Sequence, residues 1–108
     1  MKYLLIHNLE EKIKEKTLKS YLKEGYQIIY EDENNTIIKD NKEKIIDEDT
    51  YIKITINILN RNELINNSKG KIINITEAFK YAKTKKEYNK LKNKFDWYIR
   101  NIITKEII

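Results

Sequence analysis

The amino-acid sequence predicts an α+β fold, in which an antiparallel sheet of about four to five strands carries an N-terminal helix and a long C-terminal helix on one face. Three observations lead to this prediction. Apolar residues recur at helical spacing near both ends of the chain. Short runs rich in Ile and Tyr, separated by turns rich in Asn and Asp, fill the region between. One of these runs, residues 50–59, alternates apolar and polar side chains along its length.

The N-terminal part of the chain is predicted to form a strand and then a helix. Lys2–His7 is a short apolar run with strand character. A helix is expected over about residues 9–24, because apolar side chains follow one another there at a spacing of four. Asn8 and Glu11 have the spacing of a capping box at its start. Gly25 is placed to end the helix in the left-handed conformation.

Short strands and turns are predicted to follow this helix. Tyr26–Glu31 and Thr36–Lys39 have strand character and are expected to form a hairpin. Asp32–Asn35 is expected to be its turn, because Asn and Asp tolerate the left-handed conformation and bond their own backbone. A second turn at Asp40–Glu43 leads to a short predicted strand at Lys44–Asp47.

Residues 50–59 have the clearest strand pattern in the chain. Isoleucines stand at alternate positions and are expected to face a core: Ile52, Ile54, Ile56 and Ile58. The side chains between them are expected to face solvent: Tyr51, Lys53, Thr55 and Asn57. Strict alternation predicts a sheet with one buried face and one solvated face.

The rest of the chain is predicted to be a loop, an edge strand and the C-terminal helix. Residues 60–70 are loop-like, and Lys71–Ile75 is expected to be an edge strand. Helical periodicity then runs over residues 76–108. Thr84 and Glu87 have the spacing of an internal capping box, so the helix is expected either to continue or to break at Thr84.

The two sides of the C-terminal helix differ in chemistry. At 100° per residue, one side gathers residues expected in the core: Tyr81, Tyr88, Leu91, Phe95, Tyr98, Ile99 and Ile102. The opposite side is basic and carries the single tryptophan: Lys83, Lys86, Lys90, Lys94, Trp97 and Arg100. Residues 77–108 carry nine basic and four acidic side chains, so their net charge of +5 equals that of the whole chain. We predict a binding surface on this side, with a solvated helix face as the alternative.

Length and composition limit the class of protein. A chain of 108 residues is expected to form a single domain, residues 1–108. The absence of cysteine excludes disulfides, thiolate nucleophiles and Cys-ligated zinc. The sequence lacks an apolar run long enough to span a bilayer, so we expect a cytoplasmic protein without membrane association. The abundance of Ile, Lys and Asn indicates a low-GC genome, which offers codon usage as an alternative source of the lysine excess.

Acidic residues cluster in the turns of the predicted meander. Residues 31–49 carry eight acidic side chains and three lysines, a net charge of −5. The six residues at the two ends of this stretch form a predicted acidic patch: Glu31, Asp32, Glu33, Asp47, Glu48 and Asp49. The spacing of a calcium-binding loop with its central glycine is absent. We therefore expect charged turns, or a patch that contacts a basic partner, and no metal site.

The sequence presents no catalytic constellation. His7 is the single histidine and ends an apolar strand, so a structural role is expected rather than that of a general base. Ser20 and Ser68 stand in no nucleophile motif. Neither a cofactor site nor enzymatic activity is predicted.

These observations favour a non-enzymatic binding protein that acts by protein–protein contact with a larger protein. One form of this expectation is a phage or mobile-element inhibitor of a host nucleic-acid defence enzyme in a low-GC bacterium. The alternative is an RNA- or DNA-binding protein that uses the basic side of the C-terminal helix. The chain has two arginines, Arg61 and Arg100, and lysine reads base edges poorly, so that binding would be loosely electrostatic. A small RNase-type toxin built on His7, Tyr and Lys residues is the third hypothesis, and the oligomeric state is left open.

Overall fold

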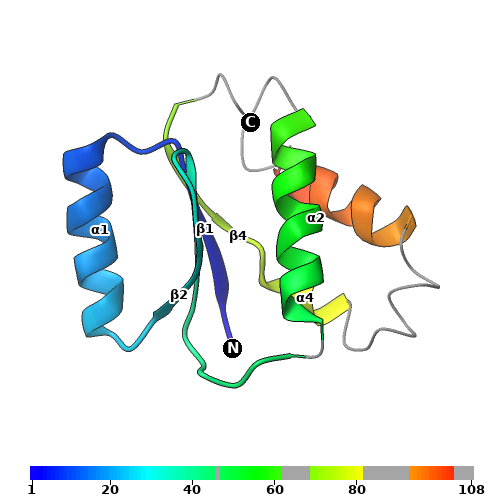
Figure 1. The fold of residues 1–108 in the computed structure, drawn as a ribbon, viewed down its shortest axis with the longest axis horizontal. Helices are drawn as coiled ribbons and strands as arrows, with labels where there is room; N and C mark the ends of the chain where they lie inside the picture. The colour runs from blue at the N-terminus through cyan, green and yellow to red at the C-terminus, as the bar shows by residue number, and fades with distance from the viewer. Residues whose placement is uncertain (46, 62–68, 82–92, 104–108) are drawn as a thin grey trace.

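The structure is a computed structural model of the 108-residue chain. It describes residues 1–45, 47–61, 69–81 and 93–103. The last of these ranges is helical and is called the C-terminal helical segment below. The elements before it are, in order, β1 (Tyr3–His7), α1 (Glu11–Lys23), β2 (Gln27–Glu31), β3 (Asn35–Lys39), α2 (Glu48–Arg61), β4 (Lys71–Asn74) and α4 (Thr76–Tyr81) (Figure 1).

The four described strands form one antiparallel sheet with the order β2-β3-β1-β4. In the centre of the sheet, Leu5 of β1 lies between Ile37 of β3 and Ile73 of β4. The predicted α+β class and antiparallel sheet are therefore confirmed. Four predicted strands are confirmed to within about two residues: Lys2–His7, Tyr26–Glu31, Thr36–Lys39 and Lys71–Ile75.

Helices cover both faces of this sheet (Figure 1). Alternate residues of β1 enter two separate cores: Tyr3 and Leu5 pack with α2, α4 and the C-terminal helical segment, whereas Leu4 and Ile6 pack with α1. Every residue of β1 and β3 is buried as a result. The prediction that the N-terminal and C-terminal helices share one face of the sheet is wrong. The prediction that the other face of the sheet is solvated is also wrong, because α1 packs on it. A clue was present in Lys2–His7, whose apolar run does not alternate, as is typical of strands covered on both faces.

The opposite placement of α1 and α2 has a topological consequence. Each of the connections β1-α1-β2 and β3-α2-β4 joins two parallel strands that are separated by one antiparallel strand. With this strand order, two right-handed crossovers would place both helices on the same face. Because the helices lie on opposite faces, one of the two crossovers is left-handed, and α1 is left as the one described helix on its face.

The strand predicted for residues 50–59 is wrong, because these residues lie within α2. Tyr51 and Thr55, which were expected to face solvent, are completely buried, while Lys53 and Asn57 are exposed. The buried positions follow helical spacing: Glu48, Tyr51, Ile52, Thr55, Ile56, Ile58 and Leu59. Because so many positions of α2 are buried, apolar residues also stand at alternate positions, and the same sequence pattern is typical of a half-buried strand. Two acidic residues in the first turn favour the helix through its dipole.

Two further predicted details are wrong. α1 begins at Glu11 with Glu10 as its N-cap and without a side-chain cap hydrogen bond, so the capping box of Asn8 and Glu11 does not form. Asn8 instead adopts a φ of 55° and donates its N–H to the carbonyl of Asn34 at 2.7 Å. The strand expected at residues 44–47 is absent from the described part of that range, where the chain crosses from β3 to α2.

The end of α1 is as predicted. Gly25 has a φ of 98° and donates its N–H to the carbonyl of Leu22 at 3.1 Å. Tyr26 donates its N–H to the carbonyl of Tyr21 at 3.1 Å, which completes a Schellman motif. The rings of these two tyrosines meet edge to face with centroids 4.9 Å apart. This closure sets the direction in which β2 begins.

Candidate functional site

The C-terminal helical segment is anchored firmly by one side. Phe95, Ile99 and Ile103 are each 0% exposed and recur every fourth residue. The ring of Phe95 lies 5.3 Å from that of Tyr51 in α2, so the segment is packed against that helix. The predicted core positions Phe95 and Ile99 are confirmed, and Ile102 is half-buried. Tyr98 is half-buried and packs against the same core. The other expected core residues lie outside the described part, Tyr81 by its side chain alone: Tyr81, Tyr88 and Leu91.

The opposite side of the segment is exposed, as its helical periodicity predicts. Trp97 is 65% exposed, and Lys94 and Arg100 flank it at positions three residues away in each direction. We call these three residues the Trp97 face. The other residues predicted for this surface lie outside the described residues: Lys83, Lys86 and Lys90.

A carboxylate organises the arginines near the Trp97 face. Arg100 Nη2 lies 3.3 Å from Asp96 Oδ2, one helical turn away, and Arg61 Nη2 at the end of α2 lies 4.0 Å from Asp96 Oδ1. These pairs are largely exposed, and such pairs contribute about 0–1 kcal/mol to stability. They place the Arg61 and Arg100 guanidinium groups around one carboxylate. With Lys94 included, this cluster still carries more positive than negative charge.

A buried polar cluster lies at the start of α2, at the other end of the helix from Arg61. Lys39 Nζ donates to Glu48 Oε2 at 2.9 Å and to the Glu43 carbonyl at 2.7 Å. The Tyr3 hydroxyl donates to the same Glu48 oxygen at 2.9 Å. Burial, and then the hydrogen bond to Glu48, raise the pKa of the Tyr3 hydroxyl. All three side chains are buried, so the cluster joins β1, β3 and α2 and presents nothing to a substrate.

The structure divides the predicted acidic patch into two groups. Glu31, Asp32 and Glu33 lie at the β2–β3 turn, whereas Asp47, Glu48 and Asp49 lie at the start of α2. These places are at opposite ends of the sheet (Figure 1), because the register puts Asn35 beside His7 and Lys39 beside Tyr3. Glu48 is buried with Lys39, and Asp49 Oδ2 lies 3.0 Å from Lys44 Nζ. No single acidic surface is formed by these six residues.

Asp32 has a structural role in the hairpin. Its Oδ1 accepts the N–H groups of Asn34 at 2.9 Å and Asn35 at 2.7 Å, and its Oδ2 accepts the Tyr30 hydroxyl at 2.6 Å. Burial raises the pKa of this carboxyl, but the hydrogen bonds outweigh burial and leave the pKa below its ordinary value. The hydrogen bond from the Tyr30 hydroxyl to Asp32 raises the pKa of Tyr30 to about 12. Asp32 therefore serves the turn that was predicted for it.

His7 also has structural surroundings. It is 1% exposed, and its Nδ1 lies 2.6 Å from the Oδ1 of Asn35, directly across the β1–β3 ladder. A buried imidazole in this position is remote from solvent, which agrees with the structural role expected for it. Within the described ranges, no group of three or more His, Cys, Asp and Glu residues is placed to hold a metal ion. Among the same residues, no helix is both long and apolar enough to cross a membrane.

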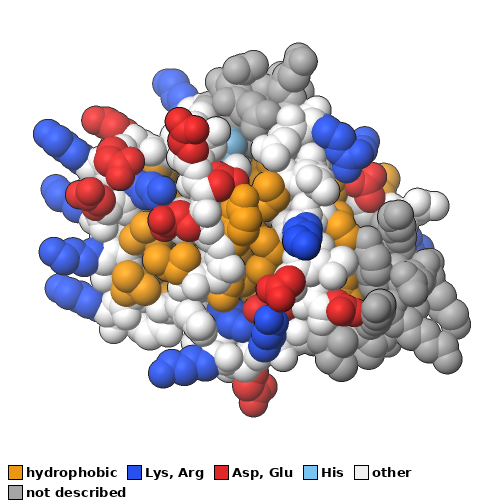
Figure 2. Space-filling model, viewed as in Figure 1, with side chains coloured by type: hydrophobic (Ala, Val, Ile, Leu, Met, Phe, Trp, Pro, Cys, Tyr) orange, Lys and Arg blue, Asp and Glu red, His pale blue; other side chains and the backbone are white. Residues whose placement is uncertain are grey.

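Two surface hollows beside α1 were missed by the sequence reasoning. One, of about 630 Å³, lies at the start of β2 and is lined by Leu22, Gly25, Tyr26, Gln27, Ile28 and Lys42. The other, of about 370 Å³, lies between α1 and Ile72 of β4. Hydrophobic side chains are visible at the surface between α1 and the strands, and lysines line the outer side of α1 (Figure 2). One signal in the sequence is that α1 has more large apolar side chains than pack on the sheet. Leu18 and Tyr21 are half-buried, whereas Ile13 and Leu22 are exposed.

The chain has no significant match among protein-family models, curated proteins or solved structures.

Proposed function

We propose that this protein is a non-enzymatic binding protein that contacts a larger protein through the Trp97 face. The observation that carries the proposal is the 65% exposure of Trp97 on a helix whose other side is completely buried. A large aromatic side chain held at the surface by a rigid helix loses little conformational entropy on binding. Tryptophan and arginine are also the residues that most often dominate protein interfaces.

The charges around Trp97 indicate what kind of surface would fit it. Lys94 and Arg100 flank the indole, and Asp96 holds the Arg100 guanidinium at 3.3 Å. A partner with an apolar pocket rimmed by carboxylates would complement this arrangement. The abundance of Ile, Lys and Asn indicates a low-GC bacterium, or a phage or mobile element living in one, as the source. Because small chains without an active-site constellation often act as inhibitors, we propose that the larger partner is a nucleic-acid enzyme of host defence.

The interior of the molecule supports a binding role over a catalytic one. The hypothesis of an RNase-type toxin relies on His7, but this ring is 1% exposed and contacts Asn35. The Tyr3–Lys39–Glu48 cluster is likewise enclosed and joins secondary-structure elements. Substitution of His7 by Ala is therefore expected to lower stability and to leave partner binding by the folded protein intact.

Binding of single-stranded nucleic acid is the second candidate. Exposed Trp97 could stack on bases while Lys94 and Arg100 neutralise phosphates. Against it, the carboxylate of Asp96 lies close to both described arginines, Arg61 and Arg100, and offsets part of their positive charge. Protein binding is favoured because an exposed tryptophan on the same helix side as an arginine matches the composition of protein-interface hot spots.

Intrinsic fluorescence separates the two candidates, because Trp97 is the single tryptophan of the chain. Single-stranded oligonucleotides that stack on Trp97 would quench its emission, with an affinity that falls steeply as salt rises. The proposal expects no such quenching at physiological ionic strength. Tight, salt-sensitive quenching would favour the nucleic-acid candidate and overturn the proposal.

A set of three matched baits tests binding to a protein partner directly. Wild type, Trp97→Ala and Ile13→Ala are immobilised and exposed to lysate of cells that encode the protein, with bound proteins quantified by mass spectrometry. Ile13 is the control, because it is also an exposed apolar residue but lies on α1. A specific partner should be lost with Trp97→Ala, with a binding loss of about 2 kcal/mol or more, and retained with Ile13→Ala. Equal recovery on all three baits would contradict the proposal.

A further inference from the structure

β2 is the last strand at one edge of the sheet, and no described element pairs with its outer side. Three of its five residues are exposed: Gln27, Ile28 and Glu31. Natural edge strands are commonly protected by lysine or proline, and β2 contains neither. Its bulge lies toward β3, between Ile28 and Tyr30. The outer backbone groups of β2 are therefore suited to pair with another strand.

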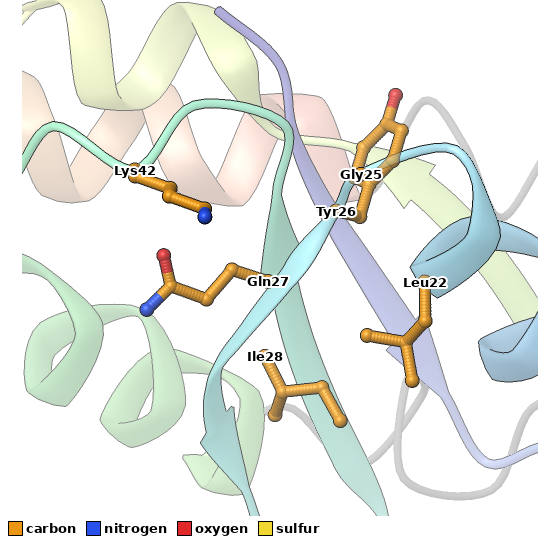
Figure 3. A pocket seen from close by; sticks show the side chains of 6 residues that line it. All are labelled: Leu22, Gly25, Tyr26, Gln27, Ile28 and Lys42. Carbon is orange, nitrogen blue, oxygen red and sulfur yellow. The ribbon is translucent and has the colours of Figure 1, made fainter.

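The hollow of about 630 Å³ lies at the start of this edge strand, where Gln27 and Ile28 line it. In Figure 3, Leu22 of α1 lies on one side of β2, and Lys42 and the Gln27 amide lie on the other. Ile28 and Leu22 supply its apolar surface and are 37% and 47% exposed. An apolar strip beside an open strand edge is the surface that strand addition uses, with backbone hydrogen bonds for affinity and side-chain contacts for specificity.

The charges near β2 differ between its two ends. Lys42 lines the hollow at the end where β2 begins, and Lys23 ends α1 at the same place. At the other end, Glu31 closes the strand, and Asp32 and Glu33 follow in the turn. Glu24 caps the end of α1, and Asp40 directly follows Lys39, which pairs with Gln27, so both carboxylates stand at the same end as Lys23 and Lys42. The end where β2 begins therefore carries charges of both signs, and the other end is acidic.

We propose that β2 pairs antiparallel with β2 of a second copy of this chain, which forms a twofold-symmetric dimer. Antiparallel pairing brings Lys42 of each copy beside the acidic end of its partner's β2, whereas parallel pairing would bring the two acidic ends together. A twofold axis also closes the assembly at two copies, because both partners use the same surface. The two sheets become one, and both α1 helices lie on the same side of it. Leu22 and Ile28 of each copy then share one apolar seam.

The mass of the full chain in solution tests this pairing. Light scattering after size-exclusion chromatography should give twice 13.1 kDa at high concentration, with dissociation on dilution. Ile28→Lys places a charge in the seam and should give a monomer. Ile13→Lys is the matched control, because Ile13 is also exposed on α1 but lies outside the hollow, and this variant should remain a dimer. Circular dichroism establishes that each variant is folded.

Charge exchange tests the antiparallel arrangement itself. Lys42→Glu and Glu31→Lys should each weaken the dimer severalfold, and the double variant should restore it, because each copy then presents the exchanged charges to the other. Amide hydrogen exchange adds a local readout, in which protection of residues 27–31 should rise with protein concentration. A monomer across the whole concentration range, a dimer indifferent to Ile28→Lys, or a double variant no tighter than the single ones would each overturn the proposal. All these residues are separate from the Trp97 face, so this test is independent of partner binding.

Discussion

The two faces of the sheet are covered very unequally. On one face, α2, α4 and the C-terminal helical segment bury a continuous cluster that includes Tyr51, Phe79 and Phe95. On the other face, α1 contributes no buried residue, and the fully buried side chains come from the sheet: Leu4, Ile6 and Ile38. We call these the α2 face and the α1 face.

This inequality separates stability from surface. Fully buried aromatic and aliphatic side chains stabilise the fold most, and they are concentrated on the α2 face. The α1 face leaves Leu22, Ile28 and Ile72 more than a third exposed. Leu22 and Ile28 line one hollow together, and exposed apolar side chains that lie side by side are typical of interaction surfaces. We therefore expect substitutions of the buried residues on the α2 face to lower stability most, and substitutions of Leu22 and Ile28 on the α1 face to alter contacts.

The largest predicted effect is on the α2 face. Phe95→Ala should lower the free energy of unfolding by about 3–5 kcal/mol, because Phe95 is completely buried against Tyr51. Leu18→Ala, at a half-buried position of α1, should cost about 1–2 kcal/mol. Urea unfolding followed by circular dichroism measures both. Equal losses for the two variants would break the comparison between the faces.

The buried ion pair is predicted to matter far more than an exposed pair close to it. Lys39→Met leaves the Glu48 carboxylate buried without its cation and should cost about 3–5 kcal/mol. The double variant Lys39→Met/Glu48→Leu should be more stable than this single variant. Lys44→Ala removes the exposed pair with Asp49 and should change stability by about 0–1 kcal/mol. A similar loss of stability for Lys39→Met and Lys44→Ala would show that burial does not determine how much each ion pair contributes to stability.

Two glycines are predicted to differ for different physical reasons. A Cβ at Gly70 would stand 2.7 Å from the Asn8 carbonyl oxygen and 2.8 Å from Leu9 Cα, so Gly70→Ala should cost about 1–3 kcal/mol by displacing backbone. A Cβ at Gly25 would meet nothing within 4 Å. Gly25→Ala should therefore cost about 1 kcal/mol, from the φ of 98° alone. Thermal unfolding of both variants checks the order, and a larger loss at Gly25 would contradict it.

The smallest predicted effect appears at alkaline pH. The Tyr3 pKa is raised from 10.0 by burial and by Glu48, so the folded protein holds this proton after the unfolded chain has released it. Stability from this group is complete below about pH 10 and is lost as pH rises further toward the folded pKa. Tyr3→Phe should lessen that alkaline loss. The pKa of Tyr26 on the α1 face is also raised, first by burial and then by Asp40.

Urea unfolding between about pH 9 and 12 measures these slopes. Tyr26→Phe is the control from the α1 face, because its side chain is more exposed than that of Tyr3. It should change the slope less than Tyr3→Phe. An unchanged slope in Tyr3→Phe would show that the buried hydroxyl does not govern the alkaline limit.

The sequence by itself determined the features that depend on neighbouring residues. α1 and its Schellman end at Gly25, the hairpin turn at Asp32, and the exposure of Trp97 opposite Phe95 all follow from local spacing and backbone preference. The described part of the candidate site, Lys94, Trp97 and Arg100, was found for the same reason. The Lys83, Lys86 and Lys90 positions lie outside the described residues and stay a prediction.

Only the tertiary structure decided the features that depend on what covers each element. The alternating isoleucines of residues 50–59 suit a strand, yet contacts with the sheet and the C-terminal helical segment bury most of their circumference and stabilise a helix. The face on which α1 lies is a matter of crossover hand, which local spacing does not encode. The Lys39–Glu48 pair and the hollow at the start of β2 each join residues from separate elements. Such contacts arise only when the elements pack, because their energies depend on burial and distance in space rather than on separation in sequence.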